Sequence, residues 1–195
     1  MSERAKWEAR YGTRDDAAAT EPPASLLVEH RGLLPAGRAL DVACGDGRNA
    51  VWLAREGFAV DAIDVAYAGL HRLAAAARRE RFTVNTVQAD LEQFPLPADR
   101  YTVVVNTRYL QRSLFPGLRR AVAPGGVIVF ETFLREQARV GHPRNPAFLL
   151  EPGELRKAFE DLEPLIDSEG PVDVAGSTSY LARLIARRPL AGHLD

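Results

Sequence analysis

The chain of 195 residues has a single cysteine, Cys44, and only two lysines, Lys6 and Lys157. One thiol cannot form an internal disulfide and cannot supply a metal site built from several cysteines. No apolar run approaches the roughly 18 residues that a transmembrane helix needs. The N-terminus leads into Trp7 and Glu8 rather than into an apolar signal segment. These absences predict a soluble, cytoplasmic protein.

The sequence also lacks an excess of charge of either sign. It has 25 basic and 26 acidic residues, which gives a formal net charge of -1. A protein without an overall positive field is not expected to bind nucleic acid or an anionic membrane surface. With 46% hydrophobic and 26% charged residues, the composition is that of a globular protein and excludes a disordered or collagen-like chain. The length fits one domain.

Short strand-like runs alternate with longer helical stretches along the chain. Such alternation is typical of a parallel sheet with helices on both faces, so we expect a doubly wound, Rossmann-like α/β fold. The predicted strands are 38–42, 58–63, 82–87, 101–105, 127–133, 162–168 and 178–187, and the predicted helices are 48–55, 66–79, 113–122 and 152–161.

The sequence predicts a main domain with an N-terminal arm before it, a short tail after it and one long internal loop. Residues 1–35 are expected to form an N-terminal arm or helix that can close over a cofactor as a lid. Residues 36–188 form the main domain, and 189–195 a tail. Within the domain, 135–150 is rich in glycine and proline and predicts an irregular loop that shapes a substrate site.

Acidic residues stand at or near the ends of three successive predicted strands. They are Asp41, Asp64 and Asp90, spaced by 23 and 26 residues, about one strand-helix-strand unit each. Ligands of open α/β sheets bind beyond the carboxyl ends of the strands. A carboxylate at the end of a buried strand is costly unless something satisfies it. Three such acids at the ends of successive strands predict a ligand site.

A glycine-containing loop follows the first strand. Gly45 and Gly47 allow a close backbone approach, and the helix from Arg48 directs free N–H groups at a ligand. Gly45-x-Gly47-x-x-Ala50 also fits a loose dinucleotide fingerprint, and Asp64 lies 19 residues after Gly45, where a ribose-binding acid is expected. A nicotinamide-dependent oxidoreductase of the Rossmann type is therefore an alternative.

Asp41 distinguishes a nicotinamide-binding site from a site for a ligand with an ammonium group. It lies within the strand, where nicotinamide-binding proteins usually carry an apolar residue, and an acid there suits a ligand with an ammonium group. Asp90 adds an acceptor suited to an exocyclic adenine amine. A sulfonium ligand that carries an amino acid, a ribose and an adenine would meet all three acids.

Several motifs resemble those of class I S-adenosylmethionine (SAM)-dependent methyltransferases over residues 36 to 187. The segment 40–49 (LDVACGDGRN) is similar to their first motif, 62–65 (AIDV) to the second and 88–91 (QADL) to the third. The segment 101–106 (YTVVVN) resembles the fourth motif, and 123–128 (APGGVI) the turn into the fifth strand. The resemblance implies a mostly parallel sheet with an antiparallel last strand.

The resemblance also implies a set of cofactor contacts. Asp64 would bind the ribose hydroxyls, Asp90 the adenine amine and Asp41 the methionine ammonium. Ala43 stands where the first glycine is usual, and Thr102 where an acid is common in the fourth strand. No metal is expected, and the product would be S-adenosylhomocysteine. The implied cofactor-binding residues are Asp41, Ala43, Gly45, Gly47, Arg48, Asn49, Asp64, Val65, Asp90, Leu91, Asn106 and Tyr11.

Further motifs resemble the small bacterial tellurite-resistance-type and thiol-methylating methyltransferases. They are Trp7-x-x-Arg10-Tyr11, Gly47-Arg48-Asn49 and the segment 148–155 (FLLEPGEL). The expected reaction is in-line transfer of a methyl group to a small-molecule acceptor, a thiol, a chalcogen or a similar group, by a monomer or homodimer. Methylation of RNA or protein with the help of a partner is the alternative within this class.

Two residues are candidates for acid-base chemistry at the acceptor. His142 is the one histidine in the predicted substrate loop, and histidine is a residue type suited to proton transfer. Tyr109 follows the fourth strand, where an acceptor is expected. A thiol that is already ionised would need little help from either.

Overall fold

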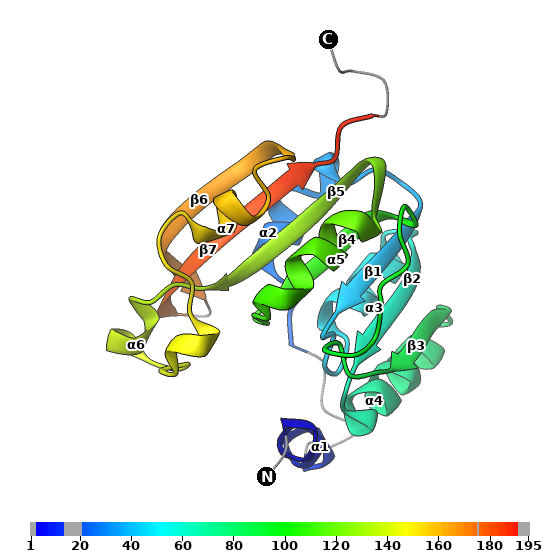
Figure 1. Ribbon diagram of the computed structural model, residues 1–195. Helices are drawn as coiled ribbons and strands as arrows, with labels where there is room; N and C mark the ends of the chain where they lie inside the picture. Colours follow the sequence, from blue (N-terminus) through cyan, green and yellow to red (C-terminus); the bar gives the residue numbers. More distant parts are fainter. Residues whose placement is uncertain (1–2, 14–20, 175, 191–195) are drawn as a thin grey trace.

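The computed structural model describes residues 3–13, 21–174 and 176–190 (Figure 1). Of the tail predicted at 189–195, residues 191–195 lie outside the described residues. Among the described residues, no helix is long and apolar enough to cross a membrane.

A seven-stranded sheet forms the centre of the molecule, in the order β3-β2-β1-β4-β5-β7-β6. β7 pairs antiparallel with both β5 and β6, and the remaining pairs are parallel. The predicted doubly wound sheet with an antiparallel last strand is confirmed. The strands are β1 (Arg38–Val42), β2 (Ala59–Asp64), β3 (Val84–Gln88), β4 (Tyr101–Thr107), β5 (Val122–Phe133), β6 (Glu163–Val174) and β7 (Ser177–Arg187).

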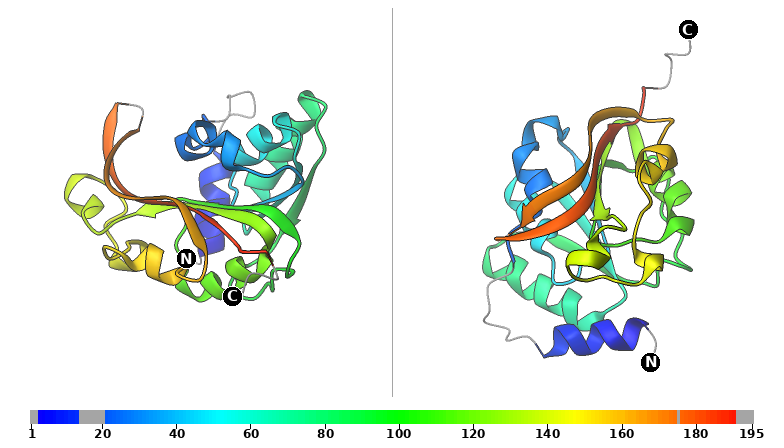
Figure 2. Two further views of the ribbon diagram at one scale, coloured as in Figure 1. Left: turned by 90° about the horizontal axis from the view of Figure 1, so that it is seen from above. Right: turned by 90° about the vertical axis from the view of Figure 1, so that its left-hand side faces the viewer.

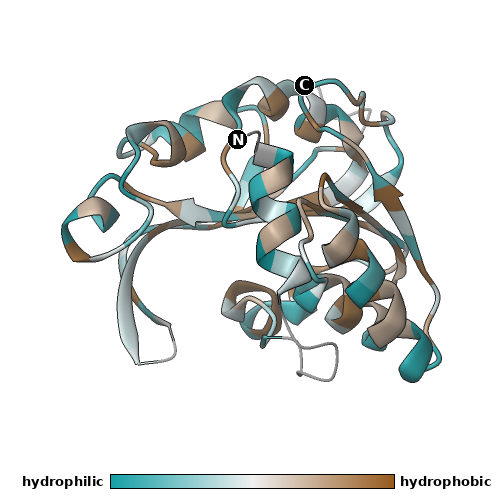
Figure 3. Cartoon of the chain, turned by 90° about the horizontal axis from the view of Figure 1, so that it is seen from below, coloured by the Kyte–Doolittle hydropathy of each residue, from teal (hydrophilic) through white to brown (hydrophobic). Residues whose placement is uncertain are grey.

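Helices cover both faces of the sheet, as Figure 2 shows in its view from above. Alternate strand residues point to opposite faces, so Ala39 and Val103 pack in one buried cluster while Leu40 and Val104 pack in the other. The first face carries α2 (Ser25–Glu29), α3 (Arg48–Arg55) and α4 (Tyr67–Arg79), and the second carries α5 (Phe115–Ala121) and α7 (Glu154–Ala158). Figure 3 shows the hydrophobic residues along the central strands and mixed hydropathy on the helices.

Most predicted boundaries hold within a few residues, and three do not. The segment 122–126, predicted as a helix end and a turn, already belongs to β5, because Val122 pairs with Tyr101 before a register shift. β6 continues to Val174, beyond the predicted end at 168, because it forms a long hairpin with β7. The helix predicted over 152–161 is only α7, since Phe159 leaves the helical conformation and enters the core.

The loop predicted at 135–150 is largely irregular but contains two short helical turns. These are α6 (Gln137–Val140) and the 3-10 turn Pro146–Phe148. A bridge between Leu134 and Leu150 closes its base. Other short elements are α1 (Glu3–Gly12) and the 3-10 turns Arg31–Leu33 and Arg112–Leu114.

Three aromatic rings join the second face of the sheet to its helices. Phe115 of α5, Phe130 of β5 and Phe159 after α7 meet with ring centroids 5.6–5.7 Å apart. Phe159 is fully buried. Contacts of this kind add to the stabilisation that burial of each ring provides.

We expect Phe159→Ala to lower the free energy of unfolding by about 3–5 kcal/mol, because it removes a large buried side chain and leaves a cavity. Urea denaturation followed by circular dichroism measures this change. Phe94→Ala, at a ring that is 37% exposed, is the matched control and should cost roughly 1 kcal/mol or less. Equal losses in both variants would contradict the assignment of Phe159 to the core.

Candidate functional site

The order of the strands reverses between β1 and β4, and the site is built at the carboxyl ends of the strands there. Val42 at the end of β1 lies beside Ile63 of β2 and Asn106 of β4. Asp64 lies beside Gln88 at the end of β3. The three predicted acids therefore follow neighbouring strands along one edge of the sheet.

The loop between β1 and α3 is tightly folded. Gly45 and Gly47 have φ angles of +58° and +86°, and Ala43 has +51°. A Cβ atom on Gly47 would lie 2.3 Å from Cδ1 of Leu73. Glycine is required at this position both by its conformation and by the packing of α4. The small Ala43 accepts a conformation that bulkier residues avoid.

Asp64 ties this loop to the next strand. Its Oδ2 accepts a hydrogen bond from the N–H of Gly45 at 2.8 Å, and its Oδ1 accepts one from the N–H of Ala66 at 2.8 Å. Burial raises the pKa of the carboxyl, and these N–H groups oppose the increase. Each carboxylate oxygen keeps further acceptor capacity for a ligand.

Asp41 is a buried acid with one unsatisfied oxygen. Its side chain is 1% exposed, and Oδ2 has no hydrogen-bond partner among the described residues. Burial raises its pKa to about 7, while the nearby Arg48 guanidinium lowers it. A buried, unpaired carboxylate oxygen is costly. The site therefore presents an acceptor that a cationic group on a ligand would satisfy.

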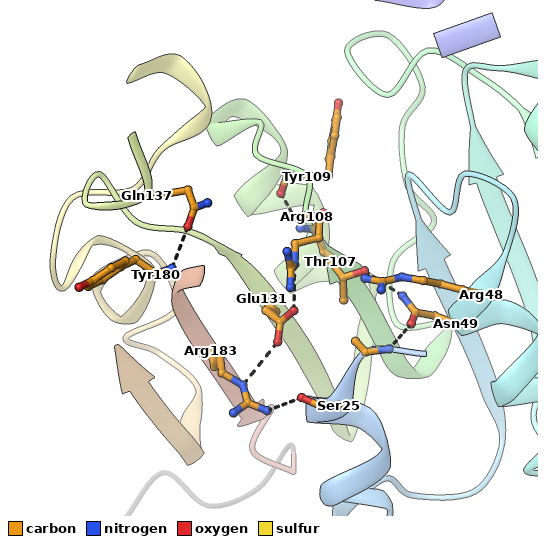
Figure 4. Close-up of polar contacts among 12 residues, drawn as sticks. Ser25, Arg48, Asn49, Thr107, Arg108, Tyr109, Glu131, Gln137, Tyr180 and Arg183 are labelled. Carbon is orange, nitrogen blue, oxygen red and sulfur yellow. Dashed lines mark hydrogen bonds and ion pairs between the residues drawn. The ribbon is translucent and has the colours of Figure 1, made fainter. Parts of the chain in front are cut away.

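The first turn of α3 connects this edge to the N-terminal arm. The buried Asn49 accepts a hydrogen bond from the N–H of Ala24 at 2.9 Å and donates one to Oγ1 of Thr107 at 2.8 Å. Arg48 donates to the carbonyl of Pro22 at 3.3 Å. Figure 4 shows Arg48, Asn49 and Thr107 on one side of the close-up. Asn49 therefore links three segments.

The loop after β3 lies next to Asp64. Asp90 is exposed, and its Oδ1 accepts a hydrogen bond from the N–H of Glu92 at 3.0 Å. Leu91 is buried in the core, and Val65 is partly buried with its carbonyl bound by Gln88. The sheet thus brings Asp90 to the same edge as Asp64, with apolar side chains beside both.

Asn106 and Tyr109 shape the loop after β4. The Asn106 amide is buried and donates to the carbonyl of Tyr109 at 2.8 Å. The Tyr109 hydroxyl donates to the side chain of Gln111. In this structure Asn106 therefore positions the loop.

Tyr11 lies against the glycine loop. Its hydroxyl is 2.3 Å from where a Cβ atom on Gly45 would be, and its ring stacks on Trp7. α1 packs on α4, and Glu8 accepts a hydrogen bond from the N–H of Ala68. Lys6 reaches within 5.9 Å of the Phe148 ring in the 135–150 loop. The helix of the arm therefore lies against the glycine loop and α4, and its role as a lid stays a prediction.

His142 lies apart from the acids. Its side chain is exposed in the loop after α6, and its carbonyl accepts a hydrogen bond from Gln137 at 3.0 Å. Among the described residues, no carboxylate contacts its imidazole ring. Gln137 is buried and also accepts a hydrogen bond from the N–H of Tyr180, which fixes α6 to β7 (Figure 4).

A group of charges beyond the end of β4, near the end of β5 and in the middle of β7 was not predicted from the sequence. Glu131 is 2% exposed and lies between Arg108 and Arg183, at 3.1 and 3.4 Å (Figure 4). Arg183 also binds Ser25 and Glu29 of α2. The sequence does carry a signal, because Glu131 and Arg183 each interrupt an apolar strand.

Two sets of residues thus meet at this edge. The ends of β1, β2 and β3 present carboxylates and backbone N–H groups. The ends of β4 and β5, together with the middle of β7, present arginines around a glutamate. No three His, Cys, Asp or Glu side chains within the described ranges converge in a way that could hold a metal ion.

Residues 39–126 match the family described as "Methyltransferase domain". Malonyl-[acyl-carrier protein] O-methyltransferase of Enterobacter lignolyticus is 32% identical over 49% of this chain and 38% of its own length. Ubiquinone biosynthesis O-methyltransferase of Escherichia fergusonii is 31% identical over 56% of this chain and 48% of its own. The chain spans less than half the length of either curated relative.

Solved structures of methyltransferases share the fold. The crystal structure of TehB from Haemophilus influenzae has a TM-score of 0.73 and 19% identity, over 93% of this chain and 67% of that chain. Geranyl diphosphate C-methyltransferase from Streptomyces coelicolor, with S-adenosyl-L-homocysteine bound, has a TM-score of 0.68 and 17% identity, over 95% and 96%. The Rossmann-like methyltransferase fold is confirmed.

The raised pKa of Asp41 predicts a dependence of stability on pH. The folded state holds this proton up to about pH 7, whereas the ordinary pKa is 3.8. Between these values the folded state binds more protons than the unfolded state, so the free energy of unfolding falls as the pH rises. Asp41→Asn should remove most of a decrease of roughly 2–4 kcal/mol.

Urea denaturation from pH 4 to pH 8 measures this slope. A smaller decrease should remain in the variant, because the pKa of Asp64 is raised as well. Asp90→Asn, at an exposed acid of the same edge, should leave the slope unchanged. The same slope in Asp41→Asn and in the unmodified protein would show that another group titrates.

Proposed function

We propose that this chain is a SAM-dependent methyltransferase that methylates a small-molecule acceptor. Two findings support the proposal: the match of residues 39–126 to the methyltransferase-domain family and the methyltransferase fold of the sheet. The single observation that carries it is the buried, unpaired oxygen of Asp41, whose pKa is lowered by the charge of the Arg48 guanidinium. A carboxylate and a guanidinium together suit the ammonium and carboxylate groups of an amino-acid ligand.

The remaining residues of the edge fit the other parts of this cofactor. Asp64 has acceptor capacity for ribose hydroxyls, and Asp90 has a second carboxylate oxygen for an adenine amine. Val65 and Leu91 offer apolar surface beside the base. Gly45 and Gly47 let the backbone approach the ligand. When bound, SAM supplies an electrophilic methyl group on a sulfonium centre.

The ends of β4 and β5, together with the middle of β7, are left for the acceptor. This part of the edge includes the loop 107–111, Glu131 and the segment 135–150. We propose a thiol, a chalcogen or a similar soft nucleophile, which attacks the methyl group in line. Alignment in a site screened from water then provides most of the rate. Tyr109 and His142 are the groups available to take a proton from an acceptor that is not yet ionised.

The alternative of a nicotinamide-dependent oxidoreductase fits this structure less well. The sheet of the Rossmann dinucleotide fold has the order 3-2-1-4-5-6, whereas here the antiparallel β7 separates β5 from β6. Asp41 would also place a buried carboxylate close to a pyrophosphate, and the like charges would repel.

Calorimetric titration with S-adenosylhomocysteine, NAD and NADP tests the proposal. We expect S-adenosylhomocysteine alone to bind. Asp64→Ala should weaken its binding by about 1–3 kcal/mol, roughly 10- to 100-fold, because charge-assisted hydrogen bonds to the ribose are lost.

Asp61→Asn is the matched control for this variant. Asp61 is an acid of the same strand that binds Arg38 and Tyr101 and lies away from the glycine loop. Its substitution can lower stability but should leave the affinity unchanged. Binding of NAD or NADP in place of S-adenosylhomocysteine would overturn the proposal.

Binding of S-adenosylhomocysteine should also release a proton. Its ammonium group near Asp41 would favour the ionised carboxylate, so affinity should increase between pH 6 and pH 7 and level off above. Titrations in buffers with different ionisation enthalpies count the released protons. If Asp41→Asn releases as many as the unmodified protein, the ammonium does not bind at Asp41.

A further inference from the structure

Arg108 lies at the acceptor end of the edge, two residues after Asn106 in the loop that follows β4. Asn106 is paired with Val42 of β1, next to the cofactor loop, and with Phe130 of β5 on the other side. Arg108 is therefore close to the point where the cofactor half of the edge ends and the acceptor half begins.

The backbone holds Arg108 in an uncommon conformation. Its φ angle is +58°, in the left-handed region that few residues other than glycine adopt. Its N–H donates to the carbonyl of Glu131 at 2.8 Å, and the Asn106 amide binds the carbonyl of Tyr109 on its other side. Residues kept in such conformations cluster at functional sites, where the surroundings compensate their cost.

The guanidinium is fixed on two sides and open on the third. Nε donates to Oε1 of Glu131 at 3.1 Å, and the flat group lies over the Phe133 ring, 4.7 Å from its centroid. The side chain is 25% exposed. Across the described parts of the chain, Nη1 and Nη2 meet no hydrogen-bond acceptor. The edge that they form is the one that binds a planar carboxylate with two parallel hydrogen bonds.

The charge of Arg108 is only partly compensated. Glu131 is shared between Arg108 and Arg183 (Figure 4), and Arg183 also binds Glu29 at 2.9 Å. The four side chains together are formally neutral, but Glu29 binds Arg183. Within the described part of the chain Arg108 forms an ion pair with no second acid, so its outer nitrogens keep the capacity for an anion.

We propose that Arg108 binds a carboxylate group of the methyl acceptor and so selects acidic small molecules. Glu131 is a positioning residue, since it holds Nε and orients the open edge of the guanidinium. This inference rests on the proposed function, because it assigns the substrate class of the same site.

The test uses the full chain saturated with S-adenosylhomocysteine. Titration calorimetry compares two probes of nearly equal shape, 4-mercaptobenzoate and 4-mercaptobenzamide, which differ in the carboxylate. The carboxylate should bind at least 10-fold more tightly. Arg108→Gln should abolish this preference and leave the affinity for S-adenosylhomocysteine unchanged.

Arg119→Gln is the matched control. Arg119 of α5 forms an ion pair with Asp161 and lies outside the segments assigned to the acceptor, so its loss removes one positive charge without changing that part of the edge. The carboxylate preference should persist in this variant. Arg108→Lys keeps the charge without the planar edge and should retain only part of the preference.

The outcomes separate the two proposals. If S-adenosylhomocysteine does not bind, the proposed function fails. If it binds but the two probes bind equally or not at all, the role of Arg108 is overturned while the function stands. Equal loss of preference in Arg108→Gln and Arg119→Gln would also overturn it, because the effect would then be one of general charge.

Discussion

The edge that we propose for the cofactor depends on the two hydrogen bonds that Asp64 accepts from Gly45 and Ala66. One carboxylate at the end of β2 fixes both the loop after β1 and the start of α4. The glycine loop then takes the left-handed conformation that places Gly47 against Leu73. A side chain without two acceptor oxygens could not hold both N–H groups. Because Asp64 is itself buried, the loop and the acid stabilise each other, and neither arrangement is favourable alone.

The part of the edge that we propose for the acceptor depends on a different element, the antiparallel strand β7. Its insertion beside β5 puts Arg183 directly opposite Glu131. The glutamate is buried between two arginines, so its charge is compensated where water is excluded. Arg183 in turn binds α2, which connects the N-terminal arm to the far half of the sheet. The two halves of the edge are thus built by different interactions on one scaffold.

The sequence predicted the sheet, and the placement of Asp41, Gly45 and Asp64 at one edge of it, because these signals are local. Alternation of apolar runs marks the strands, and Asp41, Gly45 and Asp64 lie within a short stretch of the chain. The charges around Glu131 could not be found this way, since Arg108, Glu131 and Arg183 come from three distant segments. Only the register of β5 and β7 brings them together. Likewise, the length of β6 depends on its pairing with β7. Asn106 donates a hydrogen bond to the backbone carbonyl of Tyr109 and so holds the loop after β4.

The hydrogen bond between Asn49 and Ala24 has a consequence for how the N-terminal arm can vary. Asn49 accepts a hydrogen bond from a backbone N–H, so this contact depends on the backbone conformation of the arm and not on which side chain stands at position 24. Position 24 is buried, and any small residue with an N–H would serve there. Proline, which has no N–H, would break the link. Related chains can therefore differ widely in the sequence of this arm and still keep it anchored to β4 through Thr107.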